Sequence, residues 1–352
     1  MTPLNRSEIR QRVLPAAEFP LWVPLLTHYR QERDRLVIDT ARMQRQAAEV
    51  RRSIRLWMLA GTTGDGWELS ETQFDALLNF SLSAAFRRLD ARTLIGVLRP
   101  TTAEVIARIE RLRQWLGLTV MTPLEDTIAA VAAQGLVGVT VCPPVGRAIT
   151  QADIRAHYRR VCEAARMPVV VYQLPQITGN SIAPETLSQL VAERPEIILF
   201  KDSSGADTIA QRGLPDLCLL RGAEGDYAAM LKAFGGGYDG FLLSTGNTLG
   251  PRLRILVEQV QTGRRAEALA ISAELTRLVQ ALFAAVQDAP SGNPFSNANR
   301  AVDHLLAYGR TWRQQPLPLL LSGSRLPEAL IATVESLLEA THWLPDQGYL
   351  VG

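Results

Sequence analysis

The feature that most constrains the fold is a regular alternation of eight short apolar runs with longer amphipathic stretches. The runs lie at 21–27, 54–61, 93–98, 136–142, 168–173, 197–201, 217–222 and 240–244. Near-continuous apolar runs are typical of parallel strands that are buried on both faces. The stretches between them carry helical patterns, as at 70–89 and 183–195. This alternation predicts a parallel sheet, and eight such units predict an α/β fold of the (β/α)8 TIM barrel type.

A doubly wound open sheet is the alternative arrangement of the same elements. Such a sheet is expected to carry a phosphate-binding or dinucleotide-binding signature after one of its strands. The segment GTTGDG at 61–66 has neither the GxGxxG spacing nor the lysine of a P-loop. The barrel is therefore the favoured prediction.

Three parts are expected along the chain. Residues 1–18 resemble an N-terminal helical arm, residues 19–265 contain the barrel, and residues 266–352 read as a C-terminal helical region. Between the third and fourth strands, residues 99–135 hold two helical patterns where a barrel unit needs only one. We therefore expect an insertion in that crossover.

The composition excludes several classes of function. The 37 basic and 35 acidic residues nearly balance, without a block of like charges, so no nucleic acid partner is expected. The three cysteines and four histidines lack the paired spacing of a disulfide framework or a metal site. No apolar run approaches the roughly 18 residues of a membrane span, and the first residues lack the apolar core of a signal peptide. We expect a soluble, cytoplasmic protein that does not bind membranes.

Lys201 is the strongest candidate for a catalytic residue. Only Lys201 and Lys232 among the 37 basic residues are lysines, and Lys201 directly follows a buried strand, at the barrel end where catalytic groups lie. Burial lowers the pKa of an amine, and a neutral amine can attack a ketone to form a Schiff base. The alternative is a structural lysine paired with an acid such as Asp202. Lys232 falls in a helical pattern and is expected to be a surface or interface charge.

Two further strand ends carry polar groups. Tyr172 ends the strand before that of Lys201, and a phenol near a Schiff base can transfer protons. Thr62 and Thr63 lie in a turn between Gly61 and Gly64, where hydroxyls and free N–H groups can bind one carboxylate. The alternatives are a packed tyrosine with a satisfied hydroxyl and an ordinary tight turn in which Asp65 caps a short helix.

Together these segments resemble the class I, Schiff-base-forming family of dihydrodipicolinate synthase and N-acetylneuraminate lyase. The resemblance rests on GTTGD at 61–65, YQLP followed by TG at 172–179, KDSSG at 201–205 and GAEGDYAAMLKAFGGGYDGFLLSTGN at 222–247. Their order and spacing agree over roughly residues 20–300. The resemblance implies a barrel, often a tetramer of two tight dimers, that acts on pyruvate or other 2-oxo acids with no cofactor beyond the lysine imine.

The resemblance also implies roles for individual residues. Lys201 is expected to form the imine, Tyr172 to transfer protons, and Thr62 to contact Tyr172 in a proton relay. Thr63 and the N–H groups of its turn are expected to bind the carboxylate of the 2-oxo acid. The remaining substrate-binding positions are then assigned to Gly64, Ile177 and Leu242.

The chain departs from the family pattern at three places. Asp65 stands where the turn usually has Glu, and Pro144 and Val145 stand where the synthases have a pair of tyrosines. Ile177 stands where they have an arginine that grips the carboxylate of the second substrate, and an aliphatic chain cannot replace a guanidinium. We therefore do not expect a typical dihydrodipicolinate synthase.

The second-substrate side is expected to be more apolar than in the synthases, with Val145, Ile177 and Phe241 contributing. Glu224 and Asp226 either contact hydroxyls of a sugar-like substrate or, as the simpler interpretation, cap the helical pattern that follows.

The leading hypothesis is a homo-oligomeric lyase or aldolase, a class I carbon–carbon lyase acting on pyruvate or another 2-oxo acid. Two alternatives remain at this point. One is a 2-oxo sugar acid dehydratase with the same imine chemistry, and the other is a non-catalytic barrel that binds 2-oxo acids.

Overall fold

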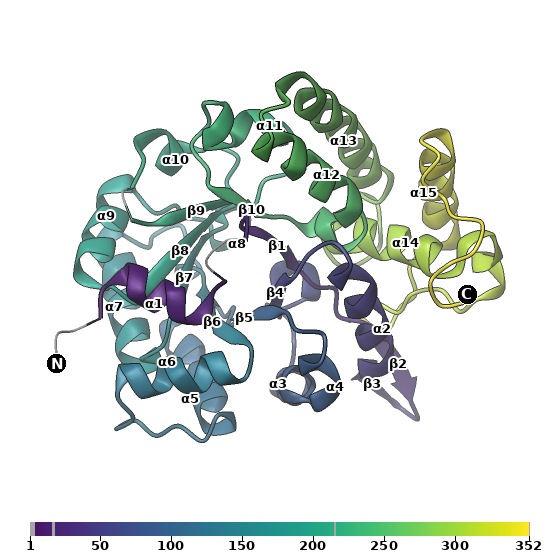
Figure 1. Ribbon diagram of the computed structural model, residues 1–352. Coiled ribbons are helices and arrows are strands. Elements are labelled where there is room, and N and C mark those ends of the chain that lie inside the picture. Colours follow the sequence, from purple (N-terminus) through teal and green to yellow (C-terminus); the bar gives the residue numbers. More distant parts are fainter. Residues whose placement is uncertain (1–3, 16–17, 215, 352) are drawn as a thin grey trace.

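The centre of the computed structural model is a closed barrel of eight parallel strands, in the order β1-β10-β9-β8-β7-β6-β5-β4 (Figure 1). The structure describes residues 4–15, 18–214 and 216–351. The barrel strands are β1 (Leu21–Pro24), β4 (Leu56–Leu59), β5 (Arg92–Gly96), β6 (Leu136–Val141), β7 (Val169–Gln173), β8 (Ile197–Asp202), β9 (Cys218–Arg221) and β10 (Gly240–Leu242). Each strand overlaps one of the eight apolar runs, so the predicted (β/α)8 barrel is confirmed.

Strand residues alternate between two apolar clusters. One cluster fills the barrel interior and includes Trp22, Met58 and Leu242. The other lies between the strands and the surrounding helices and includes Val23, Trp57 and Phe241. Because successive side chains of a strand point to opposite faces, burial on both faces requires the near-continuous apolar runs seen in the sequence.

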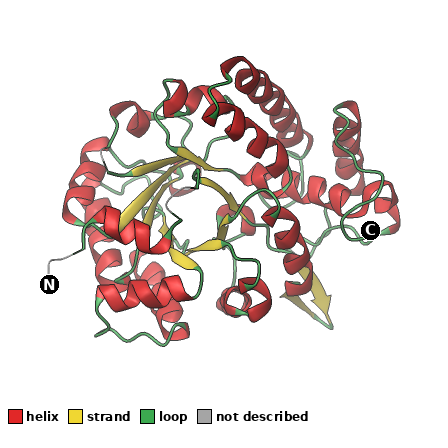
Figure 2. Cartoon of the chain, in the orientation of Figure 1, coloured by secondary structure: helices red, strands yellow, loops and turns green. Residues whose placement is uncertain are grey.

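Helices surround the barrel on its outer side (Figure 2). They are α2 (Thr40–Arg51), α3 (Glu71–Leu82), α4 (Ala84–Arg87), α5 (Thr102–Trp115), α6 (Leu124–Ala133), α7 (Gln151–Ala165), α9 (Pro184–Glu193), α10 (Thr208–Arg212), α11 (Tyr227–Met230) and α12 (Gly250–Gln261). Short helical turns add η1 (Thr62–Gly64), α8 (Pro175–Thr178), η2 (Lys232–Phe234) and η3 (Ser244–Asn247). Reciprocal capping boxes at Ser70, Thr101 and Thr150 begin three of the long helices.

The crossover from β5 to β6 contains both predicted helices, α5 and α6. A two-stranded antiparallel hairpin that the sequence pattern did not predict follows β1, formed by β2 (Tyr29–Glu32) and β3 (Arg35–Ile38). Most of its residues are polar and at least partly exposed, so it left no apolar run to detect. Lys232 lies in η2, where its amine pairs with Asp239 at 2.7 Å.

The N-terminal helix α1 (Arg6–Val13) covers the amino-terminal end of the barrel. Its buried residues Ile9 and Val13 join the interior cluster. The Arg6 side chain donates to the Ile197 carbonyl oxygen, at the start of β8, at 2.6 Å. Residues 1–3 and 16–17 of the predicted arm lie outside the described residues.

The C-terminal region consists of α13 (Arg265–Ala285), α14 (Pro294–Tyr308), η4 (Gly309–Gln314) and α15 (Glu328–Ala340). It lies beside the barrel, and α13 contacts α11, α12, α14 and α15. Among the described residues, α13 is the one helix long and apolar enough, by length and composition, to cross a membrane. Glu274 and Arg277 interrupt its sequence, so it contains no continuous apolar run of the length of a membrane span. In this structure the apolar window of α13 is 39% buried, and the helix packs on four others.

Candidate active site

Tyr172 and Lys201 lie side by side near the carboxyl ends of two neighbouring strands. They are register partners between β7 and β8, so their side chains leave the sheet on the same face. Tyr172 belongs to the interior cluster, and Lys201 Nζ lies 3.9 Å from the centre of the Tyr172 ring. The barrel thus holds an amine against a phenol in its interior.

Burial dominates the acid–base behaviour of Lys201, of which 4% is exposed. Loss of hydration lowers the pKa of its amine from 10.5 to about 7, and the negative charge of Glu224 opposes this shift in part. A substantial fraction of the amine is therefore neutral, and able to act as a nucleophile, near neutral pH.

Asp202 does not pair with Lys201, although the sequence left that interpretation open. Consecutive strand residues point to opposite faces, and the Asp202 carboxylate accepts hydrogen bonds from Tyr238 OH at 3.1 Å and Ser204 N at 2.9 Å. Among the described residues, no carboxylate lies within ion-pair distance of the Lys201 amine.

The Tyr172 hydroxyl faces two other hydroxyls. Burial raises the pKa of Tyr172 above its ordinary value of 10, and hydrogen bonding to Thr62 and Ser203 opposes that rise in part. Thr62 is itself oriented by Trp67, whose Nε1 donates to Thr62 Oγ1 at 3.2 Å. The phenol therefore stays protonated at neutral pH, in a chain of polar groups through which a proton can move.

The turn that carries Thr62 and Thr63 is η1, directly after β4. It closes through the Gly64 N–H, which donates to the Gly61 carbonyl oxygen at 3.0 Å. Thr27 Oγ1 donates to the Gly64 carbonyl oxygen at 2.7 Å and ties the turn to the segment after β1.

Helix α14 braces this turn from the C-terminal region. Ser296 Oγ donates to the Thr63 carbonyl oxygen at 2.9 Å, and Arg300 forms a buried ion pair with Asp65. The Asp65 carboxylate does not cap a helix, because it is occupied by Arg300 and by Tyr29 OH at 2.7 Å. The alternative interpretation, in which Asp65 caps a short helix, is therefore wrong.

A cavity of about 270 Å³ opens over these groups at the carboxyl end of the barrel. The barrel strands and the loops that follow them line it with Thr62, Thr63, Tyr172, Lys201, Glu224 and Leu242, and with further polar residues that include Gln176, Ser203, Ser204 and Ser244. Helices α13 and α14 line it with Thr276, Val279, Gln280, Phe283 and Phe295. Five of the predicted site residues therefore meet in one cavity: Lys201, Tyr172, Thr62, Thr63 and Leu242.

Two predicted site residues, Gly64 and Ile177, are not among the described residues that line this cavity. Gly64 packs away from it, since a Cβ added there would lie 2.7 Å from the Leu25 carbonyl oxygen. Ile177 lies on α8, where Gln176 turns inward to line the cavity and Ile177 is 37% exposed.

Phe241 and Val145 also lie away from the described lining, contrary to the expected apolar wall. Phe241 points outward from β10 into the cluster beneath the helices, while the next residue, Leu242, points inward. Val145 is 40% exposed, with its N–H donating to the Pro100 carbonyl oxygen at 2.8 Å. The apolar wall comes instead from α13 and α14.

Glu224 is held rigidly at the side of the cavity. Its carboxylate accepts hydrogen bonds from Tyr227 OH at 3.0 Å, Ser244 Oγ at 2.8 Å, and Thr245 N at 3.1 Å and Oγ1 at 2.7 Å. Asp226 begins α11, but its side chain makes no capping hydrogen bond. The simpler capping interpretation therefore does not describe either carboxylate.

The contribution of α13 and α14 to this site was not predicted from the sequence. One available signal was the density of polar side chains on α14, whose Ser296, Asn297, Asn299, Arg300 and Asp303 are all buried. Buried polar groups need partners, so such a helix must pack against polar backbone or side chains elsewhere.

Candidate metal ligands are not clustered in the part of the chain that the structure describes: no group of three or more His, Cys, Asp or Glu side chains could hold an ion. The cysteines Cys142, Cys162 and Cys218 are buried and unpaired with one another.

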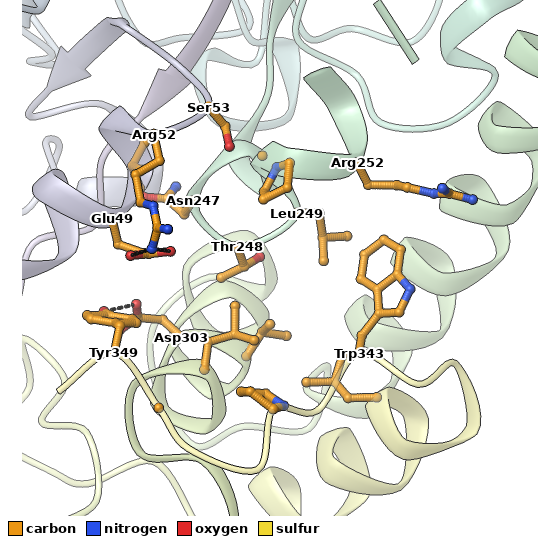
Figure 3. Close-up of a pocket in the computed structure, with 18 of the residues that line it drawn as sticks. Glu49, Arg52, Ser53, Asn247, Thr248, Leu249, Arg252, Asp303, Trp343 and Tyr349 are labelled. Atoms are coloured by element: carbon orange, nitrogen blue, oxygen red, sulfur yellow. Dashed lines mark hydrogen bonds and ion pairs between the residues drawn. The ribbon is translucent and has the colours of Figure 1, made fainter. Parts of the chain in front are cut away.

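A second cavity, of about 730 Å³, lies between the barrel and the C-terminal helices (Figure 3). Leu249, Trp343 and Tyr349 are among its lining residues. Figure 3 shows Glu49 and Arg52 paired at its edge, and Asp303 accepting a hydrogen bond from Tyr349 OH at 2.6 Å. It does not share a lining residue with the Lys201 cavity, so the larger space is not where the amine lies.

Comparisons with known proteins identify relatives of this chain. A model of the Dihydrodipicolinate synthetase family matches residues 125–292. The chain is 30% identical over 235 residues to 4-hydroxy-tetrahydrodipicolinate synthase of Parasynechococcus marenigrum (strain WH8102), covering 66% of this chain and 70% of that protein. It is 31% identical over 238 residues to the protein of that name from Synechococcus sp. (strain CC9605), with the same coverage.

Solved structures show the same fold at lower identity. A putative dihydrodipicolinate synthetase from Pseudomonas aeruginosa superposes with a TM-score of 0.70 and 20% identity, over 91% of this chain and 98% of that one. YagE, a prophage protein of the dihydrodipicolinic acid synthase family from E. coli K12 solved in complex with pyruvate, superposes with a TM-score of 0.70 and 19% identity, over 93% and 100%.

Proposed function

Since the chain belongs to the dihydrodipicolinate synthase family, whose members are aldolase-type carbon–carbon lyases, we propose that it makes or breaks a carbon–carbon bond of pyruvate or another 2-oxo acid through an imine on Lys201. The observation that carries the proposal is the in-register pair of Tyr172 and Lys201, with a buried amine of pKa about 7. The pyruvate complex of the similar E. coli protein supports a 2-oxo acid as the ligand.

Substrate binding begins at the turn after β4. The hydroxyl of Thr63 and the N–H groups of its turn hold the carboxylate, which directs the ketone carbon toward Lys201 Nζ. The neutral amine attacks this carbon. Tyr172 donates a proton to the departing oxygen, which leaves as water, and the Thr62 hydroxyl stabilises the resulting phenolate with a hydrogen bond.

The protonated imine then acts as an electron sink. Breaking the bond between carbons 3 and 4 of a 4-hydroxy-2-oxo acid leaves its electron pair in the enamine, while the 4-hydroxyl gives its proton to the Tyr172 phenolate and an aldehyde departs. The nearby negative charge of Glu224 favours the cationic imine over the neutral one. Protonation of the enamine and attack by water release pyruvate and the free lysine. The cycle as proposed uses no metal or organic cofactor.

Borohydride trapping tests the proposal. We expect a stable adduct on Lys201 after incubation with pyruvate and borohydride, measured by intact mass and peptide mapping. Lys201→Arg removes the nucleophile and should abolish the adduct. The matched control Lys232→Arg changes the exposed lysine paired with Asp239 and should leave the adduct intact.

Failure of wild type to form an adduct with pyruvate or a small panel of 2-oxo acids contradicts the imine mechanism. The products of turnover decide between the two imine reactions. Release of an aldehyde from a 4-hydroxy-2-oxo acid supports carbon–carbon cleavage, and loss of water without an aldehyde identifies a dehydratase.

We further propose that the protein is a homo-oligomer, a dimer or tetramer. Light scattering coupled to size-exclusion chromatography tests this, and a monomeric mass at micromolar concentration contradicts it.

A further inference from the structure

On the side formed by α13 and α14, the Lys201 cavity is lined by Val279, Phe283 and Phe295 together with the polar Thr276 and Gln280. None of the imine steps uses these residues. Phe283 of α13 and Phe295 of α14 meet there edge to face, with ring centres 5.2 Å apart and planes at 86°. Phe295 is 38% exposed although it lines a cavity. Val279 lies on the same side of α13 as Phe283, one helical turn earlier, and Leu242 continues the apolar surface inward. A ligand that reaches outward from Lys201 therefore meets two aromatic rings.

The charges of the cavity select against an anionic second reactant. Among the described residues that line it, Lys201 is the one cation and Glu224 the one carboxylate. Lys201 is consumed in the imine, so no guanidinium or ammonium remains to pair with a second carboxylate. Such a group would also face Glu224, whose hydrogen bonds hold it in place. Desolvating an unpaired carboxylate beside a like charge is unfavourable.

We propose that the second reactant is an uncharged aldehyde with a ring-sized apolar substituent, an aryl aldehyde, which packs against Phe283 and Phe295. The proposal rests on the imine function proposed above and adds the chemical class of the partner molecule. Aromatic side chains favour edge-to-face and offset contacts with a third ring, and the exposed edge of this pair offers such a contact.

The condensation step is balanced without any further reactant. The methyl group of the pyruvate imine loses a proton to the Tyr172 phenolate and becomes the enamine carbon. This carbon attacks the aldehyde carbon, so a carbon–carbon bond forms and the carbonyl π bond breaks. The new alkoxide then takes that proton from Tyr172. Water then adds to the imine and releases a 4-aryl-4-hydroxy-2-oxobutanoate, and the lysine amine is restored. The reverse sequence cleaves the same product.

A pair of aldehydes that differ mainly in charge tests the inference. With pyruvate, we compare 4-methylbenzaldehyde with 4-carboxybenzaldehyde, and include glyceraldehyde as a hydroxylated aldehyde. We expect kcat/KM for 4-methylbenzaldehyde to exceed that for both others by at least about tenfold. Product formation is followed by the mass of the 4-hydroxy-2-oxo acid.

Three variants connect the preference to the aromatic pair. Phe283→Ala and Phe295→Ala should each lower kcat/KM for 4-methylbenzaldehyde by about tenfold, through KM. Neither should change the yield of the borohydride adduct with pyruvate alone. The control Leu269→Ala removes an exposed apolar side chain from the same helix, outside the cavity lining, and should change neither quantity.

The outcomes separate this inference from the imine function. Absence of a pyruvate adduct in wild type overturns both. A normal adduct together with equal or better use of 4-carboxybenzaldehyde or glyceraldehyde, or with no reaction of any aldehyde, overturns the aryl aldehyde alone. So does an unchanged KM in both phenylalanine variants.

Discussion

Arg300 of α14 forms a buried ion pair with Asp65, the residue that ends the turn carrying Thr62 and Thr63. The two residues are far apart in sequence, and both side chains are almost completely buried, at 2% and 6% exposure. Through this pair the C-terminal region supports a turn at the carboxyl end of the barrel, where the candidate active site lies. Asp65 also adopts a left-handed backbone conformation, with φ at 59°, which neighbouring contacts must stabilise.

Removing the Arg300 side chain should therefore destabilise the folded protein and loosen the turn. Arg300→Ala leaves a buried carboxylate without its cation, a change that typically costs about 3–5 kcal/mol of stability. We expect a lower urea midpoint and, at temperatures where the variant is folded, a raised KM for pyruvate. Arg254→Ala, which removes an exposed arginine paired with Glu258, is the control and should change the midpoint little. Equal midpoints for Arg300→Ala and wild type contradict the bracing role.

The rate of imine formation with pyruvate should rise with pH through the pKa of Lys201. The neutral amine is the nucleophile, and burial lowers its pKa to about 7. Below pH 7 the amine is mostly protonated and slow, and above pH 8 the rate should level off. Stopped-flow measurement of pyruvate imine formation gives this profile. A midpoint near the ordinary value of 10.5 would show that the amine is well hydrated and would refute the argument from burial.

Stability should also depend on pH through the same lysine. Between pH 7 and pH 10.5 the unfolded chain holds a proton on this lysine that the folded protein lacks. The lysine's contribution to folding therefore becomes more favourable as pH rises through this interval. Below pH 7 the buried Lys201 amine is protonated in the folded protein, so the full desolvation cost of this charge lowers the free energy of unfolding. Lys201→Met should thus stabilise the protein most at pH 6, and progressively less toward pH 10.

Urea unfolding of wild type and Lys201→Met at pH 6 and pH 9 measures this difference. Lys232→Met, which removes the lysine of the partly exposed pair with Asp239, should show no comparable increase in the free energy of unfolding at pH 6. A gain from Lys201→Met that is the same at both pH values would indicate better packing rather than removal of a buried charge.

Tyr172→Phe should slow the chemistry while leaving the fold intact. The ring keeps its place in the interior cluster, but the variant lacks the proton donor beside Thr62 and Ser203. We expect imine formation with pyruvate to slow by about 10²- to 10⁴-fold, with little change in the melting temperature. Tyr158→Phe is the matched control, since that buried hydroxyl donates to the Val141 carbonyl oxygen at 2.9 Å and does not line the cavity. If both variants form the imine at the wild-type rate, the phenol is not the proton donor.

Much of the barrel was predictable because its determinants are local. A strand buried on both faces must be apolar at nearly every position, so β4 through β8 are visible as runs in the sequence. The helix starts at Ser70, Thr101 and Thr150 follow from capping residues within one turn. The meeting of Lys201, Tyr172 and Thr62 follows from the rule that the strand ends of a barrel face one site.

Side-chain direction was harder to predict. Phe241 and Leu242 are neighbours on β10, and Phe241 points outward while Leu242 points inward. A shift of the strand register by one residue would exchange these two directions. In the four-residue helix α8, Gln176 lines the cavity and the next residue, Ile177, points away from it. Such choices depend on the register and rotation of short elements, which an apolar pattern alone does not specify.

The sequence by itself determined the barrel, the order of its strands and the amine, phenol and hydroxyls at their ends, since these depend on local periodicity and on barrel geometry. Only the tertiary structure decided that α13 and α14 complete the cavity with Phe283 and Phe295 and hold its turn through Arg300. The packing of a helix against a distant turn depends on the shapes and charges of both surfaces at once, and neither surface can be recognised from its own segment.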